Sequence, residues 1–93
     1  MMQDKHGNTV DLGDTVRVLV IAPEALATLA EDEKPHIEGM LNNLYEIDDF
    51  PYVGKASVSI CVDEGDGRFF IGGLYLSSHE IELVQKAQQP SDA

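Results

Sequence analysis

The sequence has few of the residues that build disulfide frameworks, nucleic-acid sites or membrane spans. Cys61 is the single cysteine, so an intramolecular disulfide and a multi-cysteine zinc site are excluded. The longest apolar run, VLVIAP at residues 18–23, is far too short to cross a bilayer. The sequence MMQDKHGNTV at the start has no apolar run before a small-residue cleavage site, so no signal peptide is visible. We therefore expect a soluble, cytoplasmic protein.

Basic residues are also scarce. Six lysines and arginines stand against 17 acidic residues, which leaves a formal net charge of −11. Contacts to phosphate groups need lysine and arginine, so this balance argues against nucleic-acid binding and against docking to an anionic membrane. Residues 23–54 contain eight acidic residues and one basic residue, and therefore carry most of the charge. Two interpretations stay open: a solvated surface that aids solubility, or a docking face for a basic partner.

Length and composition indicate one folded domain over residues 1–93. With 43% apolar and 25% charged residues, the chain has the composition of a globular protein and enough length for one core. We expect the core at about residues 9–84. The polar end of the chain predicts a disordered tail at about residues 87–93.

Alternating apolar and polar residues predict a mainly β fold of about five strands. The segments are residues 15–21, 44–50, 55–63, 68–76 and 77–84. Between the first two, residues 23–43 have apolar side chains at helical spacing, which predicts one or two short helices. Short strands with tight turns are typical of a small antiparallel barrel, and Gly72–Gly73 inside a strand would mark a sharp bend or bulge in it.

The stretch VDEGDGRFFIGG, residues 62–73, combines acids with glycines and could be a cation loop, a phosphate loop or a turn. Counted from Asp63 as an EF-hand loop, glycine stands at positions 3 and 5, where oxygen ligands are required. A phosphate loop needs a Lys-Ser or Lys-Thr pair and a following helix, and neither is present in the pattern. Asp66–Gly67 between two alternating segments predicts a hairpin turn.

Carboxylates and aromatic residues near the middle of the chain are the other candidates for function. Glu46 and Asp48 share one face of a predicted strand, with Asp49 next to them; such acids form a hydrated face or a binding site. Phe50 and Tyr52 flank a proline, where they either cap the barrel or form a recognition surface.

Several motifs resemble a group of small, acidic bacterial proteins with an SH3-like barrel. The segments that carry the resemblance are GDTVRVLVI (13–21), HIEGMLNNLYEID (36–48) and LYLSSHEIELV (74–84). It covers most of residues 10–84. The resemblance implies an SH3-like barrel with a helical insertion between its first long strand and its second. It implies no activity, because no established function or catalytic motif accompanies the group.

These observations favour a non-enzymatic protein-interaction module, such as an adaptor or an inhibitor, that docks a basic protein through an acidic face. The residues expected to carry binding are Glu31, Asp32, Glu33, Glu46, Asp48, Asp49, Phe50 and Tyr52. We expect a monomer or a weak homodimer, and we assign no catalytic residue, metal ligand or cofactor. The alternative is a divalent-cation-binding protein or metal-dependent enzyme that uses Glu46, Asp48, Asp63, Asp66 and His79.

Overall fold

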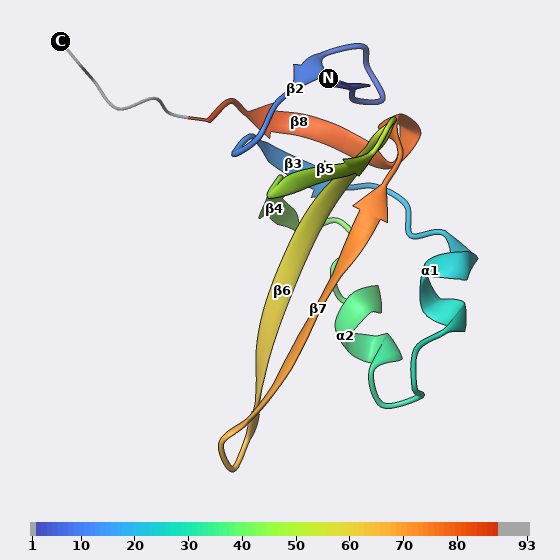
Figure 1. Cartoon of the computed structure of the whole chain (residues 1–93), viewed down its shortest axis with the longest axis vertical. Helices are drawn as coiled ribbons and strands as arrows, with labels where there is room; N and C mark the ends of the chain where they lie inside the picture. Colours follow the sequence, from blue (N-terminus) through green and yellow to red (C-terminus); the bar gives the residue numbers. More distant parts are fainter. Residues whose placement is uncertain (1, 88–93) are drawn as a thin grey trace, which may run out of the picture.

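The computed structural model describes residues 2–87 (Figure 1). These residues form a mainly β fold, as the alternating pattern predicts. The strands are β1 (Met2–Gln3), β2 (Thr9–Val10), β3 (Thr15–Val18), β4 (Leu44–Glu46), β5 (Asp49–Tyr52), β6 (Lys55–Gly65), β7 (Arg68–Leu76) and β8 (Ile81–Gln85). The helices are α1 (Pro23–Ala27), α2 (Lys34–Glu38) and the short 3-10 helix η1 (Ser78–Glu80). Most of the tail predicted at residues 87–93 lies outside the described residues.

The strands form three small antiparallel sheets, ordered β1-β2, β4-β3-β8 and β5-β6-β7. Residues 2–87 do not close into a single barrel, so the predicted closed architecture is corrected. The reason is the long β6–β7 hairpin. Its strands pair from Ala56 and Leu76 out to Gly65 and Arg68, far past the end of β5. Within residues 2–87, no third strand pairs with the distal half of this hairpin. The distal half projects from the other strands, which we call the body (Figure 1).

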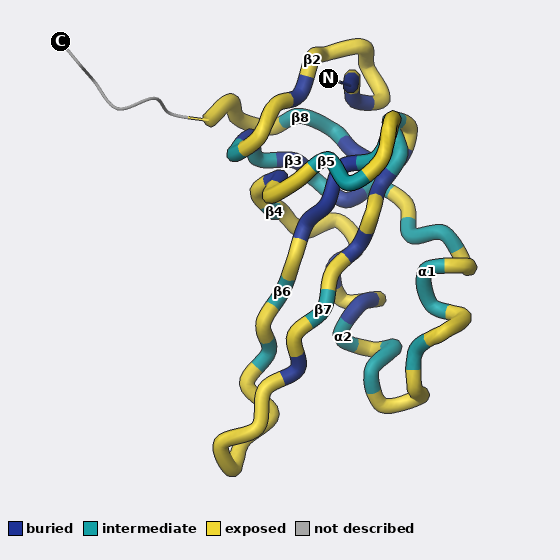
Figure 2. Tube along the Cα trace, viewed as in Figure 1, coloured by how far each residue is buried: buried dark blue, intermediate teal, exposed yellow. Residues whose placement is uncertain are grey.

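The hydrophobic core lies where the inner faces of β3, β6, β7 and β8 meet (Figure 2). Val16 and Val18 are fully buried on one face of β3, as their spacing predicts. Val20 is exposed because β3 ends at Val18, two residues earlier than the predicted alternating face requires. The core is closed by Ile37, Met40, Ile47, Ala56, Val58, Leu74, Leu76 and Ile81.

Helices α1 and α2 lie between β3 and β4, where the sequence predicts a helical insertion. Ile37 and Met40 are buried, whereas Leu41 and Leu44 are exposed because α2 ends at Glu38 and the helical spacing is not continued. No helix within residues 2–87 has both the length and the apolar character needed to span a membrane.

Helix α2 packs against the inner face of β7. The ring of His36 stacks on Phe70 with a centroid distance of 4.8 Å, and its Nε2 lies 3.2 Å from Oε1 of Glu64. Ile37 comes close to Gly72, where a methyl group would meet its Cδ1 at 3.5 Å. These contacts cover part of the inner face of the hairpin.

The β6–β7 turn confirms the hairpin predicted at Asp66–Gly67. Both residues have positive φ, 54° and 75°, as a two-residue type I′ turn requires. Of the bend or bulge expected at Gly72–Gly73, the bulge is wrong, because pairing with Ile60 and Ser59 continues there without a register shift. Glycine is needed at position 73 for close approach, since a Cβ atom would lie 2.4 Å from the carbonyl oxygen of Val58.

Buried aspartates tie the two ends of the described chain to the body. Asp4 is 3% exposed and accepts hydrogen bonds from the amides of His6, Asn8 and Leu83 at 2.7–2.9 Å. Burial raises the pKa of Asp4, but these hydrogen bonds outweigh it and hold the pKa below the ordinary value of 3.8. The β1–β2 hairpin is therefore fastened to β8 by one carboxylate.

Asp14 plays the same part at the other end. Its carboxylate, 1% exposed, accepts hydrogen bonds from the amides of Asp11 and Ala87 and from the ammonium group of Lys86. Burial raises the pKa of Asp14, and the hydrogen bonds from Lys86, Ala87 and Asp11 together hold it below 3.8. Ala87, at the start of the predicted tail, is thus bonded to the body.

Candidate interaction surface

The acidic residues predicted to form one binding face occupy two separate places. Glu31, Asp32 and Glu33 lie in the turn between α1 and α2, whereas Glu46, Asp48 and Asp49 lie on and between β4 and β5. Figure 1 shows the helices on one side of the projecting hairpin and β4 on the other. The structure therefore does not join all the predicted residues into one surface.

Two of the three acidic residues between α1 and α2 make contacts with nearby residues in the sequence. Glu31 pairs with Lys34 at 2.9 Å, and Glu33 accepts a hydrogen bond from the amide of Ala30 at 3.1 Å. Asp32 is exposed. These bonds are of the kind that stabilise short helices and their ends.

The β4–β5 group lies beside a sheet face. Asp48 accepts a hydrogen bond from the hydroxyl of Ser59 at 2.5 Å, and Asp49 stands opposite Ser57 in the β5–β6 pairing. Both acids are exposed, as is Glu46 on the adjacent β4. The carboxylates of Asp48 and Asp49 thus lie at the border of the β5-β6-β7 sheet.

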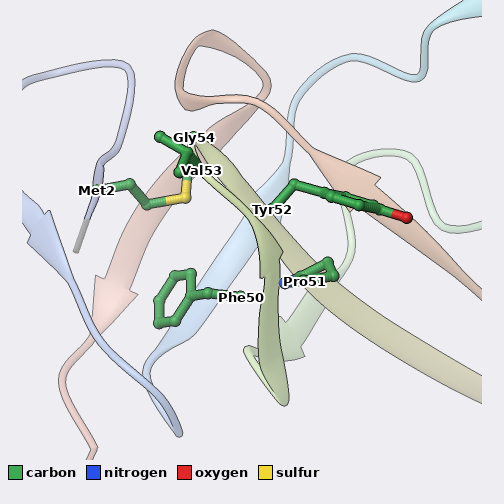
Figure 3. Close-up of a pocket in the computed structure, with 6 residues that line it drawn as sticks. All are labelled: Met2, Phe50, Pro51, Tyr52, Val53 and Gly54. Atoms are coloured by element: carbon green, nitrogen blue, oxygen red, sulfur yellow. The ribbon is translucent and has the colours of Figure 1, made fainter.

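Tyr52 joins this face, but Phe50 does not. Figure 3 shows the two rings pointing to opposite sides of β5. Residues two apart in a regular strand share a side, but the register shifts between Asp49 and Tyr52, around Pro51. Phe50 packs against the core beside Met2, at a shallow pocket of about 330 Å³. Tyr52 is 65% exposed.

The same sheet face continues along the hairpin as a stripe of exposed apolar side chains. Tyr52 and Tyr75 meet edge to face with a centroid distance of 5.8 Å, and Ile71 and Phe69 follow at two-residue spacing along β7. Tyr75, Ile71 and Phe69 are 55%, 77% and 59% exposed. We call this the outer sheet face, made of Tyr52, Phe69, Ile71 and Tyr75 with Asp48, Asp49 and Asp63 at its border.

Sequence reasoning predicted part of this face and missed part. Asp48, Asp49 and Tyr52 were predicted. Strand neighbours point to opposite sides, and of the adjacent Phe69 and Phe70 the structure buries Phe70 and exposes Phe69. Ile71 and Tyr75 were missed as exposed residues. Their two-residue spacing from Phe69 was the available signal, but the pattern alone could not tell that these side chains stay more than half exposed.

The residues of the alternative metal site are spread over the molecule. Asp63 and Asp66 lie near the hairpin tip, Glu46 and Asp48 at β4–β5, and His79 in η1. Asp63 is used locally, since it accepts a hydrogen bond from the amide of Gly65 at 2.8 Å. Within residues 2–87 no three or more His, Cys, Asp or Glu side chains are placed to share a metal ion.

Comparison of the chain with protein-family models, curated proteins and solved structures gave no match in any of the three.

Proposed function

We propose that this protein is a small, non-enzymatic interaction module that docks a basic protein partner through the outer sheet face. The observation that carries the proposal is an exposed stripe of Tyr52, Tyr75, Ile71 and Phe69 with the carboxylates of Asp48, Asp49 and Asp63 at its edge. It acts in the cytoplasm as an adaptor or as an inhibitor that covers a cationic surface of its partner.

The chemistry of this face suits such a partner. Exposed tyrosine and other large apolar side chains supply most of the binding free energy when they are buried in an interface. Carboxylates at the rim steer a cationic partner and discriminate against acidic ones, and their effect weakens as salt rises. A formal net charge of −11 extends this long-range attraction over the whole molecule.

A relation to SH3-like barrels remains part of the proposal. The antiparallel strands and the helical insertion between β3 and β4 agree with the expected order of elements. The separate sheets and the projecting hairpin are departures from a closed barrel. In such a relation, the function would reside in the hairpin and in the β4–β5 connection instead of the core.

The proposal is tested with a charge-reversal bait and a matched control. The bait is Asp48→Lys with Asp49→Lys, which changes the border of the outer sheet face. The control is Glu31→Lys with Asp32→Lys, which makes the same change in net charge at the α1–α2 turn. Proteins captured by the wild type are identified, and the affinity of each is then titrated at low and high salt.

We expect the Asp48/Asp49 reversal to weaken binding at least tenfold at low salt, and the control to retain most of it. We expect Tyr75→Ala to weaken binding at both salt concentrations, because its contribution is apolar. Equal losses in the two reversed variants would show that only net charge matters. An affinity that is independent of salt and of both reversals would contradict the proposal.

A further inference from the structure

Strand β7 is an open edge of the β5-β6-β7 sheet. It extends over nine residues, Arg68–Leu76, and pairs on one side with β6. Among residues 2–87, no backbone hydrogen bond links this strand to any element other than β6. Proteins usually protect such edges with proline, lysine, a bulge or a short strand, and β7 has no proline, no lysine and no register shift after Phe69.

The edge is also the place where two copies of this acidic chain can approach with least repulsion. Residues 69–79 form the longest stretch of the sequence without aspartate, glutamate, lysine or arginine. Elsewhere a net charge of −11 opposes the association of two copies. Helix α2 covers the inner face of β7, where His36 stacks on Phe70 and Ile37 lies close to Gly72. Among residues 2–87, no backbone hydrogen bond joins α2 to β7.

The order of side chains along β7 makes the strand complementary to itself. We propose that a second copy of the chain pairs with β7 antiparallel, about a two-fold axis at Gly72. This register keeps outer residues opposite outer residues. It places Phe69 of one copy opposite Tyr75 of the second copy, Ile71 opposite Gly73, and Phe70 opposite Leu74.

The two cross-strand pairs of the outer face are favourable in this register. An aromatic pair across an antiparallel ladder stabilises it, and a glycine opposite Ile71 leaves space for the larger side chain. The pairing would join two three-stranded sheets into one of six strands and partly cover Phe69, Ile71 and Tyr75, which are more than half exposed in the single chain. The dimer does not require the basic partner, so the two proposals fail independently.

Sedimentation of the full chain over a wide range of concentration tests the association. We expect a monomer–dimer equilibrium. Ile71→Lys should raise the dimer dissociation constant about tenfold, because a two-fold contact contains the new charge twice. Val53→Lys is the matched control. Val53 is fully exposed in the β5–β6 turn, outside the proposed β7 pairing, and its replacement adds the same charge. Both variants should keep the wild-type melting temperature of the monomer.

Cross-linking tests the register in a Cys61→Ser background. One preparation contains Phe69→Cys and the other contains Tyr75→Cys, and the two are mixed under mild oxidation. Directly opposed residues in a ladder are close enough for a disulfide, so the mixed dimer should form in higher yield than either preparation forms alone. Val53→Cys mixed with Val84→Cys serves as the control pair. A monomer at every concentration overturns the proposal, and so does a dimer that is insensitive to Ile71→Lys and forms no 69–75 cross-link.

Discussion

The body of the molecule and the distal β6–β7 hairpin are built on different principles. In the body, side chains such as Val16, Val18 and Ile81 are fully buried, and the carboxylates of Asp4 and Asp14 join distant segments. In the hairpin, the ladder and the turn define the conformation, while Phe69 and Ile71 stay exposed. Buried contacts that stabilise the fold are therefore concentrated in the body, whereas the hairpin exposes apolar side chains to solvent.

The largest expected effect on the free energy of unfolding concerns β7, a strand that runs through both the body and the hairpin. Leu76, at the body end of β7, is 1% exposed, whereas Ile71, five residues earlier, is 77% exposed. Leu76→Ala should lower the free energy of unfolding by about 3 kcal/mol, because it removes buried methyl groups and leaves a cavity. Ile71→Ala should change it by less than about 0.5 kcal/mol. Urea denaturation measures both changes. Equal effects would show that the hairpin contributes as much to stability as the body does.

The next effect concerns the buried carboxylate of Asp4. Asp4→Ala should lower the free energy of unfolding by about 2–3 kcal/mol, because three backbone amides lose their acceptor. Asp49→Ala is the control, since that carboxylate is exposed and, among residues 2–87, accepts a hydrogen bond from the neighbouring amide of Phe50 alone. Thermal melting of both variants at neutral pH compares them.

Acid titration measures how much the ionised carboxylate of Asp4 contributes to stability. The pKa of Asp4 in the folded state is below the ordinary value of 3.8, so its stabilising contribution is complete above that pH and is lost as pH falls through the lower, folded-state pKa. The free energy of unfolding should therefore decline less steeply below pH 3.8 in Asp4→Asn than in the wild type. Identical slopes would show that Asp4 does not carry the effect.

The smallest effect should lie at the hairpin turn. Gly67 has a φ of 75°, so Gly67→Ala should lower the free energy of unfolding by about 1 kcal/mol through left-handed backbone strain. Asp66→Gly, at a φ of 54°, replaces a strained residue with one that accepts this conformation and should be nearly neutral. Hydrogen exchange of the β6 and β7 amides reports whether the loss is confined to the hairpin.

Local patterns predicted the long strands β6 and β7 and the turn between them. They predicted about five strands where residues 2–87 form eight, because residues 44–50 divide between β4 and β5 and the short β1 and β2 were not expected. Contacts between distant residues were beyond local patterns. The strand at residues 55–63 and the turn at Asp66–Gly67 each depend on residues that are neighbours in the sequence. Both could therefore be predicted from a short segment alone. The helical spacing predicted within residues 23–43 was only partly realised, because α2 ends at Glu38. Phe50 and Tyr52 were seen to flank a proline, but their opposite directions depend on the register of β5 with β6.

The candidate surface was predicted less completely than the fold. Asp48, Asp49 and Tyr52 lie together as the sequence interpretation proposed, whereas Glu31 and Phe50 lie elsewhere for structural reasons. Exposure of Ile71 and Tyr75 could not be foreseen. The alternating sequence pattern does not show whether one face of the strand or both faces are covered by other elements.

Composition and local pattern alone determined the acidic charge, the mainly β class, the type I′ turn and the place of the helical insertion, since each depends on residues close together in the chain. Tertiary structure alone decided that Asp4 meets Leu83, 79 residues away, and that Asp14 meets Lys86, 72 residues away. It also decided that, within residues 2–87, the outer sheet face of the β6–β7 hairpin leaves Phe69, Ile71 and Tyr75 more than half exposed. The physical reason is that burial and hydrogen bonding depend on which segments meet in space, and no single segment contains that information.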